Sequence, residues 1–491
     1  MTAPDATPRR WAGRYELVVG LEVHVQLRTR TKAFCNCSTD FGAPPNANTC
    51  PVCLGLPGTL PVLNYEAVVL AVRTALALGA DVHDVSVFAR KNYFYPDMPK
   101  GYQISQFDRP LATGGRVPIG ETTDGAPLDI ALTRVHMEDD AGKSVHDRFA
   151  GATAVDLNRA GTPLIEIVSE PDLRSAAEAG AYLRSLKQIV EYVGASDASM
   201  EEGSLRVDAN VSARPIGETK LGTKTEIKNV NSFSAVERAI EWEFDRQCGV
   251  LAGGGRVAQQ TMLWDGNRGE CRPARSKEDS HDYRYFPEPD LPPLILTPEW
   301  IEARRAELPE LPAARRTRLR EQFGLTIADV EVLTATPEIA DYFESVARVH
   351  GDARVAANWV RRDVLKAVNE TGRPIAEFQL QVRPADLAAL LDMTRDGVVS
   401  GSAASTIFTL MVRTGEAPRR IAEREGLLQV SDDAPLRAWV DEVFAEHPAE
   451  AERYMAGDRK LQGPLVGFVM KKSGGSADPK KVNALLAERM R

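Results

Sequence analysis

A glutamate and a histidine stand two residues apart in the stretch V-V-G-L-E-V-H-V-Q-L, residues 18–27. From residue 19 onward the odd positions are apolar and the even ones are not, which is the period of a half-buried β-strand. Glu22 and His24 are therefore expected on one strand face, where a carboxylate and an imidazole can hold one cation or pass one proton. Taken alone, the segment fits an incidental polar face equally well.

Four later segments also bring charged groups to one side of a predicted strand or into an apolar run. Glu138 shares a strand face with Arg134 and His136. Glu166 interrupts the run P-L-I-E-I-V, where an unpaired carboxylate would be costly to bury. The other two segments alternate with apolar residues, and their polar positions are Arg206, Asp208, Asn210, Ser212, Arg214, Lys224, Glu226 and Lys228. Because β-propensity disfavours such faces, we expect a concave sheet that lines a polar site.

Carboxylates suit Mg²⁺, and basic groups suit the oxygen atoms of a polyphosphate, so these strands predict a site for both. Two segments that look like P-loops fail in detail. The segment 141–144 lacks the first glycine because residue 137 is Met, and the segment that begins at Gly217 places Thr before its lysine. Nucleotide binding of the P-loop type is therefore not expected.

Four of the six cysteines form two close pairs, Cys35 with Cys37 and Cys50 with Cys53. Their loop is rich in Pro, Asn and Gly and offers little apolar material to hold it folded, whereas two such pairs can surround a tetrahedral Zn²⁺. We predict a structural zinc site here. Free or redox-active thiols are the alternative, because the first pair has a single intervening residue. A catalytic zinc is disfavoured, since four cysteines leave no open coordination position.

The composition is that of an ordinary globular protein of several domains, with 43% hydrophobic and 26% charged residues among 491. No apolar run is long enough to span a bilayer and the N-terminus does not read as a signal peptide, so a cytoplasmic location is expected. The net charge of -9 argues against general attraction to nucleic acid. Residues 457–491, however, carry eight basic against three acidic residues. This basic segment either contacts RNA locally or is an ordinary solvent-exposed face, and the sequence is compatible with both.

Amphipathic helices are expected at 65–78, 174–193 and 233–248. Two loops, 90–108 and 280–291, interleave aromatic residues with charges and prolines, and either bind a ligand or are simply well packed. His281 in the second loop is a weaker candidate for a ligand or a base. Beyond Leu291 a proline-marked linker leads into sequence that reads almost entirely as helices, with a break near 415–418.

Six stretches closely resemble the B subunits of the bacterial glutamyl/aspartyl-tRNA amidotransferases, the GatB family. They are G-L-E-V-H-V-Q-L (20–27), R-K-N-Y-F-Y-P-D-M-P-K-G-Y-Q-I-S-Q (90–106), H-M-E-D-D-A-G-K-S (136–144), D-L-N-R-A-G-T-P-L-I-E-I-V-S-E-P-D (156–172), M-E-E-G-S-L-R-V-D-A-N-V-S (200–212) and D-Y-R-Y-F-P-E-P-D-L (282–291). The similarity extends from about residue 15 to the C-terminus, and the tail resembles the YqeY family.

The resemblance implies an enzyme subunit that uses ATP and Mg²⁺ to phosphorylate the side-chain carboxylate of misacylated Glu-tRNA(Gln) or Asp-tRNA(Asn). Ammonia released from glutamine by a partner amidase, the A subunit, would pass through a channel and displace the phosphate. The products would be Gln-tRNA(Gln) or Asn-tRNA(Asn). A small C subunit would complete a heterotrimer.

The resemblance also implies roles for individual residues. The Mg²⁺ site would comprise Glu22, His24, Glu138, Glu166 and Asp208. The catalytic groups would be His24 and, at the mouth of the channel, Glu138 beside Lys91 and Lys100. From the strand faces we expect the nucleotide to contact Arg206, Asn210, Lys224 and Lys228. All four zinc cysteines, which many members of the family lack in part, are present.

The expected fold class is α+β, with an N-terminal antiparallel-sheet cradle, a helical domain and a helical, YqeY-like tail. We place the boundaries at 1–14 for a flexible N-terminus, 15–296 for the cradle with its zinc loop 35–53, 297–415 for the helical domain and 416–491 for a tRNA-binding tail. A non-catalytic, zinc-stabilised tRNA-binding subunit is the alternative function. A stand-alone amidase is disfavoured, because the sequence has no G-x-S-x-G nucleophile turn.

Overall fold

The computed structural model describes residues 11–121, 127–149, 151–274, 283–430 and 433–490. The chain divides into two compact units, Met1–Ala314 and Arg315–Arg491. Most of the predicted flexible N-terminus, and His281 in the second aromatic loop, lie outside the described residues. Among the helices in the described ranges, none combines the length and the apolar character that crossing a membrane requires.

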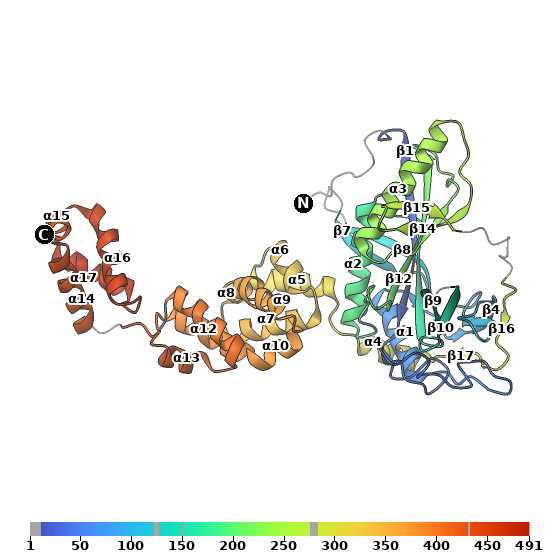
Figure 1. The fold of residues 1–491 in the computed structure, drawn as a ribbon, viewed down its shortest axis with the longest axis horizontal. Coiled ribbons are helices and arrows are strands. Elements are labelled where there is room, and N and C mark those ends of the chain that lie inside the picture. Colours follow the sequence, from blue (N-terminus) through green and yellow to red (C-terminus); the bar gives the residue numbers. More distant parts are fainter. Residues whose placement is uncertain (1–10, 122–126, 150, 275–282, 431–432, 491) are drawn as a thin grey trace. The chain divides into compact units, whose positions relative to one another are not determined.

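A large, mostly antiparallel sheet forms the centre of the first unit (Figure 1). Its strand order is β15-β14-β13-β12-β1-β11-β8-β6-β2, with β7 also paired to β8 and with β13 and β14 parallel. The strands are β1 (Tyr15–Gln26), β2 (Asp81–Val82), β6 (Ala112–Thr113), β7 (Arg116–Glu121), β8 (Pro127–Asp139), β11 (Pro163–Ser169), β12 (Leu205–Pro215), β13 (Thr225–Lys228), β14 (Gln260–Asp265) and β15 (Glu270–Pro273).

The alternation in β1 explains how the sheet acquires an apolar and a polar face. Its odd-numbered residues from Leu17 to Val25 are buried in the main hydrophobic core of the unit. Helices α2 and α3 contribute their apolar faces to the same core and lie along the sheet in Figure 1. Ser175 and Ser232 cap these two helices by accepting backbone hydrogen bonds. The helices of the unit are α1 (Tyr65–Ala77), α2 (Ala176–Tyr192), α3 (Phe233–Ala252) and α4 (Pro298–Ala306).

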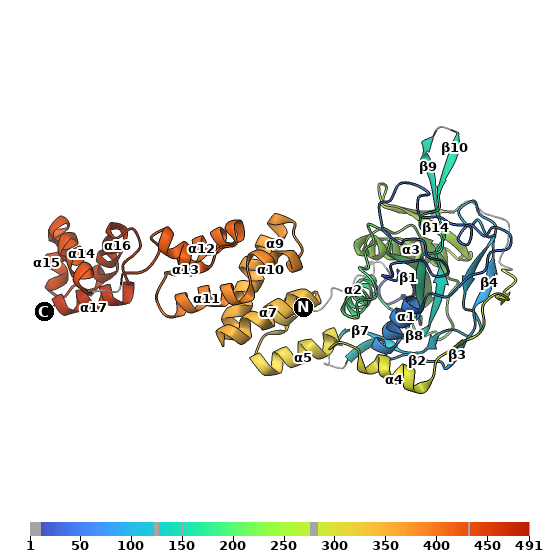
Figure 2. The same cartoon turned by 90° about the horizontal axis from the view of Figure 1, so that it is seen from below.

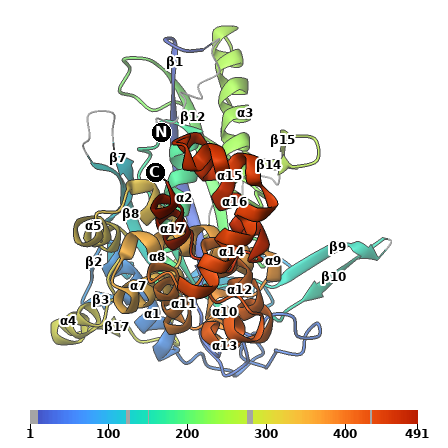
Figure 3. The same ribbon diagram turned by 90° about the vertical axis from the view of Figure 1, so that its left-hand side faces the viewer.

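Smaller sheets flank the large one. A three-stranded sheet joins β16 (Phe286–Pro287), β4 (Ala89–Asn92) and β5 (Tyr102–Ser105), so it brings the two aromatic loops of the sequence together. A short pair joins β3 (Val85–Ser86) to β17 (Leu294–Ile295). The ribbon of β9 (Lys143–Phe149) and β10 (Ala152–Asp156) projects from the unit in Figures 2 and 3.

The second unit is helical, with one core formed by α5 to α13 and another by α14 to α17. The helices are α5 (Pro312–Phe323), α6 (Ile327–Leu333), α7 (Pro337–His350), α8 (Ala353–Trp359), α9 (Leu365–Thr371), α10 (Ile375–Gln381), α11 (Pro384–Arg395), α12 (Gly401–Thr414), α13 (Pro418–Arg424), α14 (Asp433–Glu446), α15 (Pro448–Met455), α16 (Gln462–Lys472) and α17 (Pro479–Arg489). A π-helical turn, Val360–Val364, joins α8 to α9, and a 3-10 turn, Arg459–Leu461, precedes α16. The predicted α+β class, with a sheet domain followed by helices, is confirmed.

Candidate active site and metal centre

The register of four neighbouring strands brings the polar side chains of the first unit to one face. His24 in β1 pairs with Glu166 in β11 on one side and with Arg206 in β12 on the other. Glu166 in turn pairs with His136 in β8. Since directly paired residues of an antiparallel sheet project from the same face, these side chains converge.

Two histidines and two glutamates form the first cluster on this face. His24 Nε2 lies 3.5 Å from Glu138 Oε1 and 3.5 Å from Glu166 Oε2. His136 Nε2 lies 3.1 Å from Glu166 Oε2 and 3.8 Å from Glu138 Oε2. Both carboxylates are almost fully buried, with 3% of Glu138 and 7% of Glu166 exposed. One ligand atom from each of His24, Glu138 and Glu166 lies within 4.8 Å of the others, close enough to share one cation.

Burial and pairing oppose each other in the pKa values of this cluster. Burial lowers the pKa of His136, but hydrogen bonds with Glu138 and Glu166 outweigh it and raise that pKa to about 9. Burial alone would raise the pKa of Glu166, yet its contacts with His136 and His24 bring it well below the usual range. His136 is therefore protonated at neutral pH and faces both carboxylates. Burial lowers the pKa of His24 as well, but its hydrogen bond with Glu166 and the nearby carboxylate charges outweigh burial and raise that pKa. A cation would take the place of these protons, because a histidine ligand must be deprotonated.

A second cluster adjoins the first along β1 and β12. It consists of Glu22, Asp208 and Glu226, whose ligand atoms also lie within 4.8 Å of one another. Lys228 Nζ lies 2.6 Å from Asp208 Oδ2 and 3.0 Å from Glu226 Oε1, and Asn210 Nδ2 donates to Glu22 Oε1 at 2.9 Å. Of the five residues predicted as Mg²⁺ ligands, His24, Glu138 and Glu166 lie in the first cluster, and Glu22 and Asp208 lie in the second.

The groups predicted to contact a nucleotide lie around these clusters. Glu22, Asn210 and Lys224 line a cavity of about 260 Å³ that runs along the polar face beside β1 and β12. Arg206 Nη2 donates to the buried Asp140 Oδ1 at 2.8 Å, and Asp140 also accepts a hydrogen bond from Gln26.

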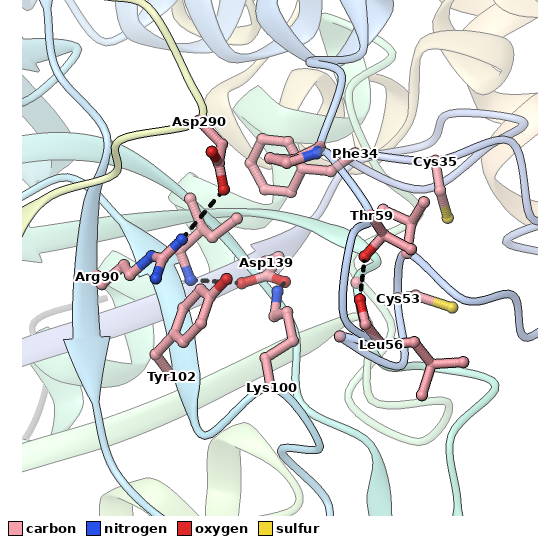
Figure 4. A pocket seen from close by; sticks show the side chains of 15 residues that line it. Phe34, Cys35, Cys53, Leu56, Thr59, Arg90, Lys100, Tyr102, Asp139 and Asp290 are labelled. Atoms are coloured by element: carbon pink, nitrogen blue, oxygen red, sulfur yellow. Dashed lines mark hydrogen bonds and ion pairs between the residues drawn. The ribbon is translucent and has the colours of Figure 1, made fainter.

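The two lysines predicted at one channel mouth have different partners. Burial lowers the pKa of Lys91, but the charges of Glu138 and of neighbouring groups outweigh that effect and raise it. Its ammonium also lies 5.1 Å from the ring centre of Tyr283. Lys100 instead pairs with Asp139, the residue after Glu138, and lines a cavity of about 200 Å³ next to the cysteine loop (Figure 4).

Sequence reasoning placed His136 and Glu226 on polar strand faces but assigned them no role in the site, and it did not single out Asp139 or Asp140. The signal for the first two was already available, since both occupy polar positions of alternating strands. Asp139 ends β8 and Asp140 follows it. Asp139 pairs with Lys100 and Asp140 with Arg206, and both partners are distant in sequence. Alternation within one strand cannot predict such ion pairs.

The four predicted zinc cysteines lie together. Their sulfur atoms are within 4.8 Å of one another, and the loop 31–62 that carries them forms no regular helix or extended strand. A hydrogen bond from Cys35 lowers the pKa of the Cys53 thiol to about 4 against the opposing effect of burial. Four sulfur ligands that lie this close together fit a tetrahedral Zn²⁺. Only Cys53 is fully buried, and Cys35 and Cys53 border the cavity in Figure 4.

Comparison with known proteins places this geometry in context. Residues 17–302 match the family described as GatB/GatE catalytic domain, and residues 341–490 match the GatB domain family. The chain is 53% identical over 480 residues to the aspartyl/glutamyl-tRNA(Asn/Gln) amidotransferase B subunit of Geobacter sulfurreducens, covering 97% of this chain and 99% of that protein. It is 52% identical over 478 residues to the protein of the same name from Moorella thermoacetica, covering 97% of this chain and 100% of that protein.

Proposed function

Since this chain belongs to the family of aspartyl/glutamyl-tRNA(Asn/Gln) amidotransferase B subunits, we propose that it activates the side-chain carboxylate of a misacylated tRNA for amidation. The substrate is Glu-tRNA(Gln), Asp-tRNA(Asn) or both. ATP gives its terminal phosphoryl group to the carboxylate oxygen, ADP leaves, and ammonia then displaces phosphate to form the amide. The observation that carries the proposal is the cluster of His24, Glu138 and Glu166 on the polar face.

The donor set of this cluster fits a divalent cation. Two buried carboxylates supply the oxygen ligands that Mg²⁺ prefers, and His24 offers an imidazole whose proton can be replaced. Mg²⁺, when bound there, would offset the negative charge that phosphoryl transfer concentrates. Glu138 and Glu166 would hold such a cation, and their burial would limit the access of competing water.

The second cluster and its cavity fit the nucleotide. Lys224 and Asn210 line a cavity that Glu22 also borders, and Lys228 and Arg206 stand on the same sheet face. Basic groups beside carboxylates suit a polyphosphate that arrives with its own cation.

Lys91 and Glu138 are suited to act on the nitrogen nucleophile. The Glu138 carboxylate, with which the Lys91 charge interacts, would accept the proton from ammonium and leave ammonia able to attack. Lys91, whose pKa is raised, would stay protonated and support the ionised form of Glu138. Lys100 with Asp139 is a second proton-carrying pair at the wall of the neighbouring cavity. The ammonia would come from glutamine hydrolysed by the amidase A subunit in a heterotrimer with a small C subunit.

The cysteine loop is proposed to bind a structural Zn²⁺ through Cys35, Cys37, Cys50 and Cys53. The tail, residues 416–491, is proposed to contact tRNA together with the helical domain, residues 297–415. Arg459, Lys460, Lys471 and Lys480 support this, since all four are exposed. Their positive charge contrasts with the net charge of the whole chain.

The test is product formation by the purified complex of this chain with its partner subunits. With ATP, Mg²⁺ and ammonium, it should convert Glu-tRNA(Gln) to Gln-tRNA(Gln) or Asp-tRNA(Asn) to Asn-tRNA(Asn). Failure with both tRNAs would refute the proposal. ATP consumption that depends on misacylated tRNA separates it from the alternative, a zinc-stabilised tRNA-binding subunit without catalysis.

A further inference from the structure

Lys32 is a fully buried lysine at the base of the cysteine loop. None of its surface is exposed, and its ammonium donates to Asn48 O at 2.6 Å, to Leu157 O at 3.4 Å and to Cys53 Sγ at 3.6 Å. Within the described part of the chain, its hydrogen-bond partners include no carboxylate. A buried ammonium without a counter-charge is strongly destabilising, so its negative partner must come from the cysteine cluster.

The charge of a four-cysteine zinc site supplies that partner. Four thiolates around one Zn²⁺ leave two negative charges uncompensated, and such charge is costly at Cys53, the buried member of the four. The ammonium of Lys32 and the backbone N–H of Cys50, 3.2 Å from Cys53 Sγ, both point at the most buried of the four sulfur atoms. Such contacts around the ligands orient them and hold them in the thiolate form.

Lys32 also ties the cysteine loop to the segment that leads into the polar site. Its side chain bonds Leu157, and the next residue, Ala33, donates its backbone N–H to Gly161 O at 2.8 Å. Gly161 has a φ of +87°, and a Cβ there would lie 3.4 Å from both Cys53 and Lys32, so the two segments are in close contact. Gly161 N in turn donates to Asp140 O at 2.8 Å.

We propose that Lys32 is the counter-cation and positioning residue of the four-cysteine metal site. Its charge offsets the thiolates through Cys53, and its bonds to Asn48 and Leu157 hold the loop in the shape that lets the sulfur atoms converge. The inference rests on the proposed zinc site but goes beyond it, because it assigns metal affinity to a residue that is not a ligand.

The test compares the zinc affinity of the full wild-type chain with that of Lys32→Met and Lys32→Gln by competition with a chelator of known affinity. Loss of the Lys32 contact with the ligand sulfur of Cys53 should weaken zinc binding by about 10–100-fold. Lys32→Gln keeps a donor without the charge and covers the case in which Lys32→Met does not fold. Lys187→Met is the control, because Lys187 likewise donates to two carbonyls, Asp197 O and Ala198 O, but also pairs with Glu191 at 2.8 Å and contacts no cysteine in the described structure.

Substitution with Co²⁺ adds a readout of the ligands themselves. At saturating Co²⁺, the Lys32 variants should keep the visible and charge-transfer bands of a four-thiolate tetrahedral site, because the sulfur ligands are intact. Zinc affinity equal to wild type in either folded variant overturns the proposal, as does equal weakening in Lys187→Met. A wild-type chain that binds neither metal overturns this proposal and the zinc site together, while leaving the amidation activity as a separate question.

Discussion

Replacing Glu166 by glutamine tests the first cluster with little change in shape. Glutamine has the size of glutamate and keeps one acceptor oxygen, so the substitution removes a charge and leaves the packing of β11 intact. In the structure this charge faces His136 at 3.1 Å and His24 at 3.5 Å. The substitution therefore separates what the carboxylate does for stability from what it does for chemistry.

The stability cost follows from these contacts. A hydrogen bond to a charged group contributes about 1.5–3 kcal/mol to stability. Glu166 makes one such bond with His136 at 3.1 Å and a longer, weaker contact with His24 at 3.5 Å. We expect Glu166→Gln to lower the free energy of unfolding by roughly 2 kcal/mol, which leaves the first unit folded at 25 °C.

The effect on activity should be larger. If Glu166 holds the cation that stabilises the transferring phosphoryl group, its loss should lower the rate of amide formation at least about 100-fold, comparable to losing one preorganised group that faces developing charge. That corresponds to roughly 2.7 kcal/mol of activation free energy. The assay measures conversion of misacylated tRNA with ATP and ammonium at several Mg²⁺ concentrations. The Mg²⁺ needed for half-maximal rate should rise about tenfold, and tRNA affinity should stay as in wild type.

Glu243 is the matched control. It is fully buried in α3, accepts two hydrogen bonds from Arg246 at 2.8 and 2.7 Å, and belongs to a helix that packs on the apolar face. Glu243→Gln should cost about 3 kcal/mol of stability, the low end for a broken buried pair, while its folded fraction keeps wild-type activity. A folded Glu166→Gln chain with a wild-type rate, or an equal loss of activity in the Glu243 variant, would refute the assignment.

Three further predictions concern the other parts of the site. Lys91→Met should lower amide formed from ammonium about 100-fold, while ATP consumption with misacylated tRNA persists; unchanged product per ATP would contradict its role at the nucleophile. Deleting residues 416–491 should raise the KM for tRNA about tenfold with little change in kcat, and an equal KM would remove the tail from the tRNA interface. Cys50→Ser should abolish zinc in metal analysis and lower the melting temperature of the first unit by roughly 5 °C; a zinc-loaded, equally stable variant would show that another ligand set holds the metal.

Alternation within one strand could be predicted from the sequence because it is a local property. The pattern around Glu22 and His24 fixed their common face, and the same rule found Glu138, Asp208 and Lys228 on their strands. The amphipathic helices expected at 174–193 and 233–248 are present as α2 (Ala176–Tyr192) and α3 (Phe233–Ala252), because helical periodicity is also local. None of these inferences needed knowledge of a second strand.

What the sequence could not supply is the register between strands. The pairing of β1 with β11 sets His24 against Glu166, while the pairing of β1 with β12 sets Glu22 against Asp208. The pairing of β12 with β13 then adds Glu226 opposite Asn210. Strand faces and family motifs indicate which residues share the polar face, but only the register shows which of their ligand atoms lie within 4.8 Å of one another. The set of five Mg²⁺ ligands stays a prediction.

The two clusters differ in the cation that already balances them, and this difference suggests their separate tasks. In the first, the carboxylates are balanced by imidazoles, which become metal ligands once they lose a proton. In the second, they are balanced by Lys228, whose pKa is raised above its ordinary value because Asp208 and Glu226 outweigh the opposing effect of burial. A lysine that stays protonated cannot be a ligand, but it can pair with a phosphate oxygen. This difference supports our proposal that the first cluster holds Mg²⁺ and that Lys228, beside the second, pairs with the phosphates of the nucleotide.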